Sequence, residues 1–117
     1  MSYIPTICLD FDGVMNTYDG WKGVNELFQP REGLKAFLVK LQEKNYRVVI
    51  HSTRNPTKII SWLMKYDLGN LVQEVTDKKP SALVYLDDRA LKFEGVFCDA
   101  VIAEIFTFKT HWEKKNA

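Results

Sequence analysis

Short apolar runs and segments of helical spacing alternate along most of this chain. Four runs of apolar and β-branched residues predict strands, at residues 3–9, 46–50, 71–75 and 82–86. Two segments between them predict helices, of which the first begins at Pro30 and ends near Asn45 and the second follows Asn55. Strands that alternate with helices favour a three-layer, Rossmann-like α/β fold, in which helices cover both faces of a parallel sheet.

The same spacing predicts which helical side chains face the core and where the second helix begins. The expected inward positions are Leu34, Phe37, Leu38, Leu41, Ile59, Ile60, Leu63 and Met64. Asn55 is suited to cap the second helix, because its side chain can accept a hydrogen bond from a free backbone N–H. Pro56 then occupies the first helical position.

The rest of the chain is less regular. Residues 14–29 contain several Gly, Asn and Asp residues and predict a loop or a short hairpin. Beyond the fourth strand, residues 92–97 can form a short strand and residues 101–106 a closing helix, whereas residues 114–117 are expected to fray.

Composition limits the classes of protein to be considered. With 117 residues, 46% of them hydrophobic, residues 1–117 are expected to form a single globular domain. The net charge of +1 gives no global field that would attract nucleic acid or anionic membranes, and no apolar stretch approaches the roughly 18 residues of a membrane span. We therefore interpret the protein as soluble and cytoplasmic. Cys8 and Cys98 lie in apolar runs without a zinc-binding spacing and are expected to be buried.

Two acidic residues mark the end of the first predicted strand, where the sequence is Asp10-Phe11-Asp12-Gly13. Because side chains alternate along a strand, Asp10 and Asp12 face one way while Phe11 faces the core. Gly13 allows the backbone to turn sharply immediately afterwards. The two carboxyl groups are therefore expected to share one small site.

Further polar residues follow the predicted strands at 46–50 and 82–86, and two lysines precede the strand at 82–86. In chain order they are Ser52, Thr53, Arg54, Lys78, Lys79, Asp87 and Asp88. The carboxyl ends of parallel strands meet at one edge of the sheet, which is where open α/β sheets bind their ligands. We therefore expect these side chains to gather around Asp10.

In their order and context these motifs resemble those of the haloacid dehalogenase superfamily, which are an Asp-x-Asp strand end, a strand-end Ser or Thr, a Lys and a strand-end acidic pair. The resemblance extends from Thr6 to about Arg89. It implies a Mg²⁺-dependent phosphohydrolase that works through an aspartyl-phosphate. It also suggests that the main-chain carbonyl of Asp12 is a metal ligand.

The residue types fit this chemistry in their own right. Attack on phosphorus needs a fixed nucleophile, a proton for the leaving oxygen and cations near the equatorial oxygens. Asp10 fits the nucleophile, and Asp12 can protonate the leaving oxygen and then activate water. Lys79 would neutralise the phosphoryl oxygens in competition with Lys78, and the resemblance favours Lys79 because Pro80 follows it.

Candidate ligands for phosphate and metal come from the same set. Ser52, or Thr53 beside it, would bind a phosphate oxygen, and Arg54 could do so as well. Carboxylates about 5 Å apart repel each other by roughly 3 kcal/mol at an effective dielectric of 20, and a divalent cation removes this penalty. Oxygen ligands without Cys or His favour Mg²⁺. The expected metal-binding residues are Asp10, Asp12, Asp87 and Asp88, with at least one of the last two as a direct ligand.

The spacing of the motifs leaves little room for the cap domain that many members of the superfamily insert. An open site without a cap suits a phosphorylated small molecule or a nucleic-acid terminus as substrate. Tyr18 and Trp21, in the loop after Gly13, could stack on a base or sugar. A neighbouring subunit could also help to hold the substrate, so the sequence is compatible with an oligomer.

Two non-catalytic alternatives remain open, a phospho-acceptor module and a binding module on the same type of fold. A receiver-type phospho-acceptor also places a phosphorylatable Asp, an acidic pair, Ser or Thr and Lys on a parallel sheet. Its acidic pair, however, comes first in the chain and its Lys last. Here Asp10 and Asp12 come first and Asp87 and Asp88 follow Lys79, which favours the phosphatase.

Overall fold

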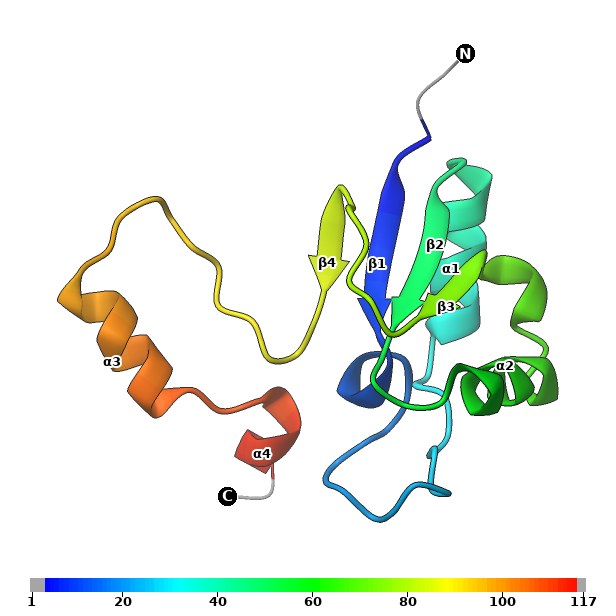
Figure 1. The fold of residues 1–117 in the computed structure, drawn as a ribbon, viewed down its shortest axis with the longest axis horizontal. Coiled ribbons are helices and arrows are strands. Elements are labelled where there is room, and N and C mark those ends of the chain that lie inside the picture. The colour runs from blue at the N-terminus through cyan, green and yellow to red at the C-terminus, as the bar shows by residue number, and fades with distance from the viewer. Residues whose placement is uncertain (1–3, 116–117) are drawn as a thin grey trace.

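The computed structural model describes residues 4–115 and contains a four-stranded parallel sheet with the strand order β3-β2-β1-β4 (Figure 1). The strands are β1 (Thr6–Asp10), β2 (Arg47–His51), β3 (Glu74–Thr76) and β4 (Val84–Leu86). The helices are α1 (Leu34–Glu43), α2 (Pro56–Lys65), α3 (Asp99–Thr107) and α4 (His111–Lys115). The predicted α/β class and parallel sheet are confirmed. Each observed strand overlaps a predicted one, and Tyr3 of the first prediction lies outside the described residues.

β1 lies in the middle of the sheet. It pairs in parallel with β2 from Thr6↔Arg47 to Asp10↔His51, and with β4 from Ile7↔Val84 to Leu9↔Leu86. The three residues before Asp10 in β1 are all buried, as expected of a strand with neighbours on both sides. β1 therefore delivers Asp10 to the carboxyl edge of the sheet, between the ends of β2 and β4.

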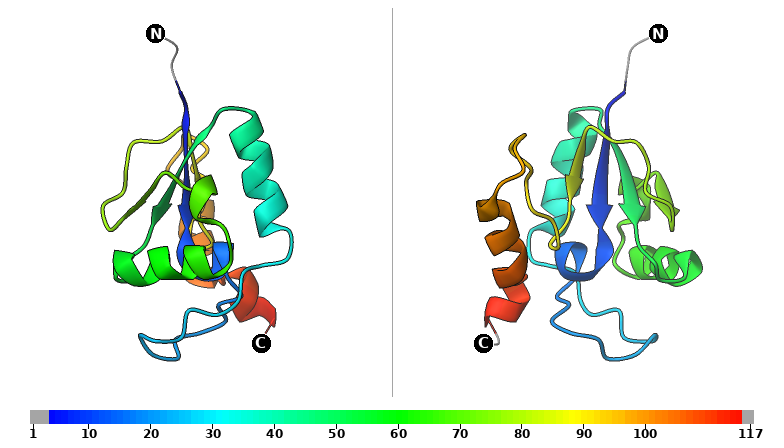
Figure 2. Two further views of the ribbon diagram at one scale, coloured as in Figure 1. Left: turned by 90° about the vertical axis from the view of Figure 1, so that its right-hand side faces the viewer. Right: turned by 60° about the vertical axis from the view of Figure 1, so that its left-hand side comes forward.

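α1 and α2 pack against the same face of the sheet. Both crossovers step in the same direction along the sheet, from β1 to β2 and from β2 to β3, and right-handed crossovers then place both helices on one side. Figure 2 shows α1 beside the sheet in the edge-on view. The core cluster on this side joins Ile7 and Leu9 of β1 to Leu38 of α1 and to Ile59 and Leu63 of α2.

The predicted inward positions of the two helices are only partly correct. Leu34, Leu38, Ile59 and Leu63 are buried and Leu41 packs at the edge of the core, but Phe37, Ile60 and Met64 are exposed. Trp62 takes an inward position that was not predicted. Its ring packs edge-on against Phe11, with the ring centroids 4.9 Å apart, and its indole N–H donates to the carbonyl of Phe28 at 2.8 Å. Phe11 is buried, as predicted.

The second helix begins as predicted and the first does not. The Asn55 side chain accepts a hydrogen bond from the Thr57 N–H at 2.9 Å, and Pro56 is the first residue of α2. Pro30, the predicted start of the first helix, instead forms an antiparallel bridge with Asn16. α1 begins only after Gly33, whose φ of 86° is incompatible with an α-helix and stops the helix from extending backwards.

In the described part of the chain, a loop lies at the face of the sheet opposite α1 and α2. Residues 77–83, which connect β3 to β4, contain no helix. By register Tyr85 lies beside Cys8, on the side away from α1 and α2. Lys79 Nζ lies 4.4 Å from the centroid of the Tyr85 ring, and the Tyr85 hydroxyl donates to the carbonyl of Pro80 at 2.6 Å. A parallel sheet with helices is therefore established, whereas the predicted helix layer on the second face is not shown.

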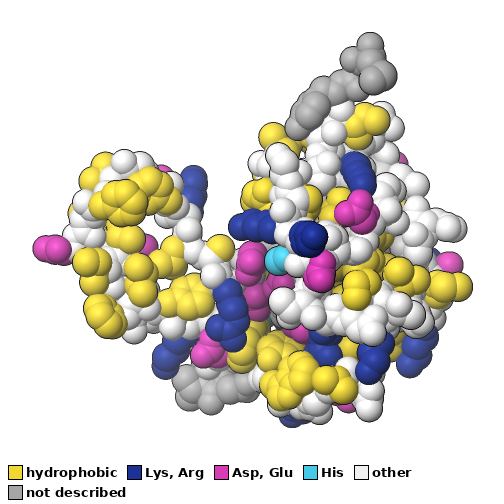
Figure 3. Space-filling model, viewed as in Figure 1, with side chains coloured by type: hydrophobic (Ala, Val, Ile, Leu, Met, Phe, Trp, Pro, Cys, Tyr) yellow, Lys and Arg dark blue, Asp and Glu magenta, His cyan; other side chains and the backbone are white. Residues whose placement is uncertain are grey.

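After β4 the chain leaves the sheet and forms an arm that contains α3 (Figures 1 and 2). The predicted helix exists, but it is not a closing helix, because Ile102, Ile105 and Phe106 are exposed. Figure 3 shows hydrophobic side chains gathered on this arm. The predicted strand at residues 92–97 does not form, and Cys98 is exposed although burial was predicted. Cys8 is buried as expected.

α4 brings the chain back to the carboxyl edge of the sheet. Thr110 and Glu113 exchange hydrogen bonds at its start: the Thr110 N–H donates to Glu113 Oε1 at 3.2 Å, and the Glu113 N–H donates to Thr110 Oγ1 at 3.1 Å. These bonds hold the pKa of Glu113 below its usual value. The helix includes Lys114, so the fraying predicted from residue 114 is wrong there, and residues 116–117 lie outside the described part. None of the helices formed by residues 4–115 has the length and apolar character needed to cross a bilayer.

Candidate active site

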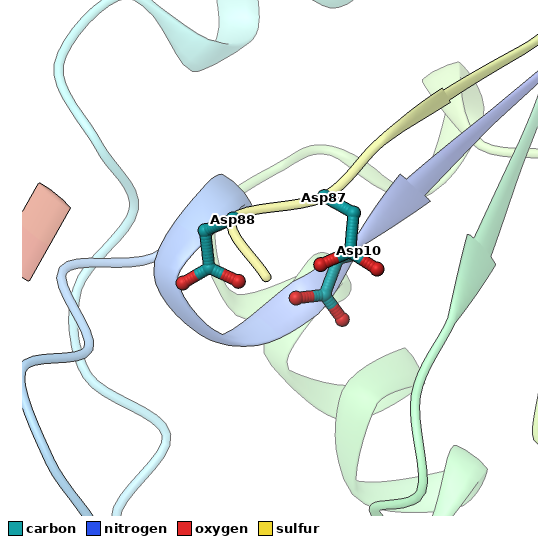
Figure 4. Close-up of side chains that lie close together, drawn as sticks. All are labelled: Asp10, Asp87 and Asp88. Carbon is teal, nitrogen blue, oxygen red and sulfur yellow. The ribbon is translucent and has the colours of Figure 1, made fainter. Parts of the chain in front are cut away.

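Three carboxylates from two neighbouring strands meet at the carboxyl edge of the sheet (Figure 4). Asp10 ends β1, and Asp87 and Asp88 follow β4 directly. One oxygen of each carboxylate lies within 4.8 Å of the others. The parallel pairing of β1 with β4 produces this arrangement, because neighbouring parallel strands deliver the residues after them to the same place.

The closeness of these carboxylates changes the protonation of Asp10. Burial, the charges of Asp87 and Asp88, and a hydrogen bond shared with Asp88 raise the pKa of Asp10 to about 7. Near neutral pH, and without a cation, the site therefore holds a proton on Asp10 for much of the time. A bound cation would favour the ionised form.

Asp12 lies apart from these three residues and has different partners. Its Oδ2 accepts a hydrogen bond from Arg54 Nε at 2.7 Å, and its Oδ1 accepts one from Asn16 Nδ2 at 3.0 Å. The cluster of carboxylate oxygens does not include the side chain of Asp12, and the prediction that its main-chain carbonyl binds the metal stays a prediction. Its side chain is instead fixed at the wall of the cavity by one charged and one neutral donor.

Arg54 is almost completely buried and only partly paired. Besides the bond to Asp12, its Nη1 donates to the carbonyl of Val24 at 3.4 Å, and the ring of Trp21 lies over the guanidinium with its centroid 5.1 Å from Cζ. Its Nη2 is buried and has no hydrogen-bond partner within residues 4–115. A buried N–H group without an acceptor is costly, and an anion beside Arg54 would relieve that cost.

Asn16 fixes the turn that follows β1. Its Oδ1 accepts from the backbone N–H groups of Gly13 and Tyr18 at 3.0 and 3.1 Å, and its Nδ2 donates to the carbonyl of Leu27 at 2.9 Å as well as to Asp12. This buried amide thus connects the catalytic candidate Asp12 to both ends of the loop that carries Trp21.

Gly13 is required by its conformation and by its neighbours. Its φ is 85°, a region that residues with a Cβ rarely adopt. A methyl group at this position would overlap Asp88 Oδ2 and come close to Trp112 Nε1. The sharp turn predicted at Gly13 is therefore present, and it leaves the space that Asp88 occupies beside Asp10.

A cavity of about 590 Å³ opens above these residues. Its lining combines acidic, basic and aromatic side chains, namely Asp10, Asp12, Asp88, Arg54, Lys58, Arg89, Tyr18, Trp21 and Trp112, together with Val24, Thr53 and Asn55. Trp21 is 61% exposed and presents a large aromatic surface at the rim. The cavity can therefore accept an anionic group near Arg54 together with a planar apolar group.

The structure brings some of the predicted phosphate-binding residues to the cavity and not others. Thr53 and Arg54 line it, whereas Ser52 is buried behind them, where its Oγ accepts a hydrogen bond from the Arg54 N–H at 3.1 Å. Lys79 lies over Tyr85 and is not among the lining residues, and neither is Lys78.

The sequence analysis did not identify two residues of this site, Asn16 and Trp112. Asn16 was noted only as one of several loop residues, and nothing in its local pattern distinguishes it. Trp112 Nε1 donates to Asp88 Oδ2 at 2.6 Å. The spacing of Thr110 and Glu113, a Thr-x-x-Glu capping box, could have predicted α4 and so placed Trp112 on a structured element.

Comparisons with known proteins give a likeness of fold. No family model matches the chain, and no curated protein matches it. One solved structure, described as that of a conserved protein coded by a locus from Bacteroides thetaiotaomicron, is similar with a TM-score of 0.59 and 18% sequence identity. The match covers 89% of this chain and 90% of that one. At this identity the likeness concerns the fold alone.

The donor set of the three-carboxylate cluster fits a hard divalent cation. All its ligand atoms are carboxylate oxygens, and they are close enough to reach one ion. Burial, followed by the charges of Asp87 and Asp88, raises the pKa of Asp10, and a bound cation would oppose this shift. Asp10, Asp87 and Asp88 are therefore the residues that would hold such an ion.

The raised pKa of Asp10 predicts how stability without metal changes with pH. Below the ordinary value of 3.8 the folded and unfolded states both carry the proton, and stability falls as pH rises through about 7, because the folded state retains a proton that the unfolded chain releases. Asp10→Asn removes this term. After allowance for solvent screening, we expect the free energy of unfolding of Asp10→Asn at pH 8 to exceed that of the wild type by ~1 kcal/mol. This difference corresponds to a rise in Tm of roughly 4 °C.

This prediction is checked by thermal unfolding in EDTA from pH 4 to pH 8. The quantity of interest is the difference in Tm between Asp10→Asn and the wild type, which should grow as pH rises. Asp67→Asn serves as the matched control, because Asp67 is exposed and, within residues 4–115, its side chain pairs with Lys35 alone, at 3.0 Å. A difference that stays constant across the pH range would contradict the argument.

Proposed function

We propose that this protein is a Mg²⁺-dependent phosphatase of the haloacid dehalogenase type, which hydrolyses phosphomonoesters through an aspartyl-phosphate on Asp10. The observation that carries the proposal is the convergence of Asp10 with Asp87 and Asp88, with Asp12 fixed at the wall of the same cavity. The order of these residues along the chain agrees with the resemblance described above. Cytoplasmic location and a single-domain organisation belong to the same proposal.

The reaction would proceed in two displacements. In the first, a carboxylate oxygen of Asp10 attacks phosphorus, the bond from phosphorus to the ester oxygen breaks, and protonated Asp12 donates its proton to the leaving oxygen. In the second, water attacks the phosphorus of the aspartyl-phosphate, Asp12 takes a proton from that water, and the Asp10 carboxylate is released with inorganic phosphate. Mg²⁺, when bound, would neutralise charge on the phosphoryl oxygens and on the acidic cluster.

Arg54 and Thr53 support the proposal from the substrate side. A phosphate in the cavity would give the buried guanidinium of Arg54 an anionic acceptor in addition to Asp12. Lys79 stays a candidate for neutralising the phosphate only if it leaves the ring of Tyr85. Ser52 supports the site from behind through its bond to the Arg54 N–H.

The non-catalytic alternative is a protein that accepts or binds phosphate without turnover. A phospho-acceptor needs its Asp and its metal-binding acids but not a second carboxylate that activates water. Asp12 lies in the same cavity as Asp10 and is held there by Arg54 and Asn16. This second acid favours hydrolysis over a stable phosphorylated state.

Removing the nucleophile tests the proposal directly. Asp10→Asn should abolish the hydrolysis of p-nitrophenyl phosphate, because an amide does not attack phosphorus, while circular dichroism shows an intact fold. Asp12→Asn should lower turnover by about 10²- to 10⁴-fold and retain Mg²⁺ binding. Asp67→Asn, which changes an exposed aspartate away from the cavity, should have wild-type rates. Substantial turnover by Asp10→Asn would refute the proposed nucleophile.

Metal removal tests the role of the acidic cluster. EDTA should abolish hydrolysis, and added Mg²⁺ should restore it in the wild type. Mg²⁺ should restore much less activity in Asp87→Ala or Asp88→Ala, because each variant lacks one carboxylate ligand. The same assay with nucleotides, sugar phosphates and 3′- or 5′-phosphorylated oligonucleotides would identify the substrate class. Full activity in EDTA would count against the mechanism.

Trp21 provides a test for the leaving group. If a nucleobase stacks on this exposed ring, Trp21→Ala should raise KM for nucleoside monophosphates about fivefold, equivalent to ~1 kcal/mol of stacking, with little change for sugar phosphates. Trp21→Phe keeps an aromatic face and should show a smaller effect. Equal changes for both substrate classes would rule out stacking.

A further inference from the structure

We infer that Trp112 is a positioning residue of the metal site, which acts by fixing the carboxylate of Asp88 from the C-terminal helix α4. The inference rests on the proposed function, because it assigns a role within the proposed Mg²⁺ site. It goes beyond that proposal by making a segment far along the chain from all four acidic residues a working part of the site.

The contact between the two residues is short and specific. The indole Nε1–H donates to Asp88 Oδ2 at 2.6 Å, and Asp88 offers a carboxylate oxygen within 4.8 Å of those of Asp10 and Asp87. The indole bond is made by a neutral donor. It therefore holds one oxygen of Asp88 in place while the residue keeps its negative charge and its other oxygen stays available to a cation.

Asp88 needs such support more than Asp87 does. Asp87 is restrained locally, because its Oδ1 accepts a hydrogen bond from the backbone N–H of Arg89 at 2.8 Å. Asp88 follows a three-residue strand and faces two other carboxylates that repel it when they are ionised. Without a donor on its outer side, Asp88 would be free to rotate away from the cluster.

α4 is held firmly enough to serve this purpose. His111 Nε2 donates to the carbonyl of Gly13 at 2.8 Å, and the ring of Trp112 packs edge-on against Tyr18 with the centroids 5.1 Å apart. The guanidinium of Arg89 lies over the ring of Trp112, with Cζ 5.2 Å from the ring centroid. The helix is thus attached both to the loop after β1 and to the loop after β4, the two segments that carry the acidic cluster.

The decisive variant is Trp112→Phe, which keeps an aromatic ring on α4 but replaces the indole by a smaller ring without an N–H donor. We expect its Kd for Mg²⁺, measured by calorimetry with the metal alone, to rise at least tenfold, in the range found when groups that orient metal ligands are removed. In a hydrolysis assay the Mg²⁺ concentration for half-maximal rate should rise by a similar factor, whereas kcat at saturating Mg²⁺ stays near the wild-type value.

Trp21→Phe is the matched control. It makes the same chemical change at another wall of the same cavity, where the indole has no bond to Asp88, and it should leave the Kd for Mg²⁺ within twofold of the wild type. A Trp112→Phe protein that also stays within twofold would overturn the inference.

A double-mutant cycle separates positioning from a general loosening of the structure, and it stays informative if Trp112→Phe is less stable. If Trp112 acts through Asp88, its replacement should cost no further Mg²⁺ affinity in an Asp88→Ala background. If Trp112→Phe lowers Mg²⁺ affinity as much in the Asp88→Ala background as in the wild type, the inference is overturned.

The proposed function can fail separately. Wild-type protein that binds Mg²⁺ but hydrolyses no phosphomonoester would refute the phosphatase, and the cycle would still decide the role of Trp112. Absence of Mg²⁺ binding by the wild type would overturn the inference as well.

Discussion

The parallel pairing of β1 with β4 is the constraint on which the candidate site depends. Leu9 and Leu86 are partners in the register, so the residues that follow them, Asp10 and Asp87, leave the sheet side by side. The backbone hydrogen bonds of the sheet thereby hold together carboxylates that repel each other. Burial of the strand before Asp10 stabilises this arrangement, and hydrogen bonds from Trp112 and from the backbone N–H of Arg89 hold the carboxylates of Asp88 and Asp87.

The sequence predicted this part of the molecule well because the relevant signals are local. An apolar run followed by two acids marks Asp10 and Asp12, a second run marks Asp87 and Asp88, and topology rules place strand ends at one edge. The cap at Asn55 is equally local and was also correct. These predictions needed only strand periodicity and the chemistry of the residues that follow each strand.

The errors concern features that depend on contacts far along the chain. Phe37, Ile60 and Met64 were placed inward by helical spacing, yet all three are exposed, so the buried stripe of each helix is narrower than the spacing predicted. The resemblance favoured Lys79 at the site; its Nζ lies over the ring of Tyr85 in this structure, and its role toward phosphate stays a prediction. Trp112 reaches Asp88 across 24 residues, a contact that no periodicity reveals.

The four acidic residues fall into two groups with different surroundings, and this division fits a two-role chemistry. Asp10, Asp87 and Asp88 lie close together, and burial together with the charges of the other two raises the pKa of Asp10.

Asp12 lines the same cavity with Arg54 and Asn16 as donors, and these two hydrogen bonds set the orientation of its side chain. Under the proposed function, the first group would hold the metal, and Asp12 would present a single carboxyl group at a fixed place in the same cavity. Separate environments for neighbouring carboxyl groups are what allow one to attack and another to transfer protons.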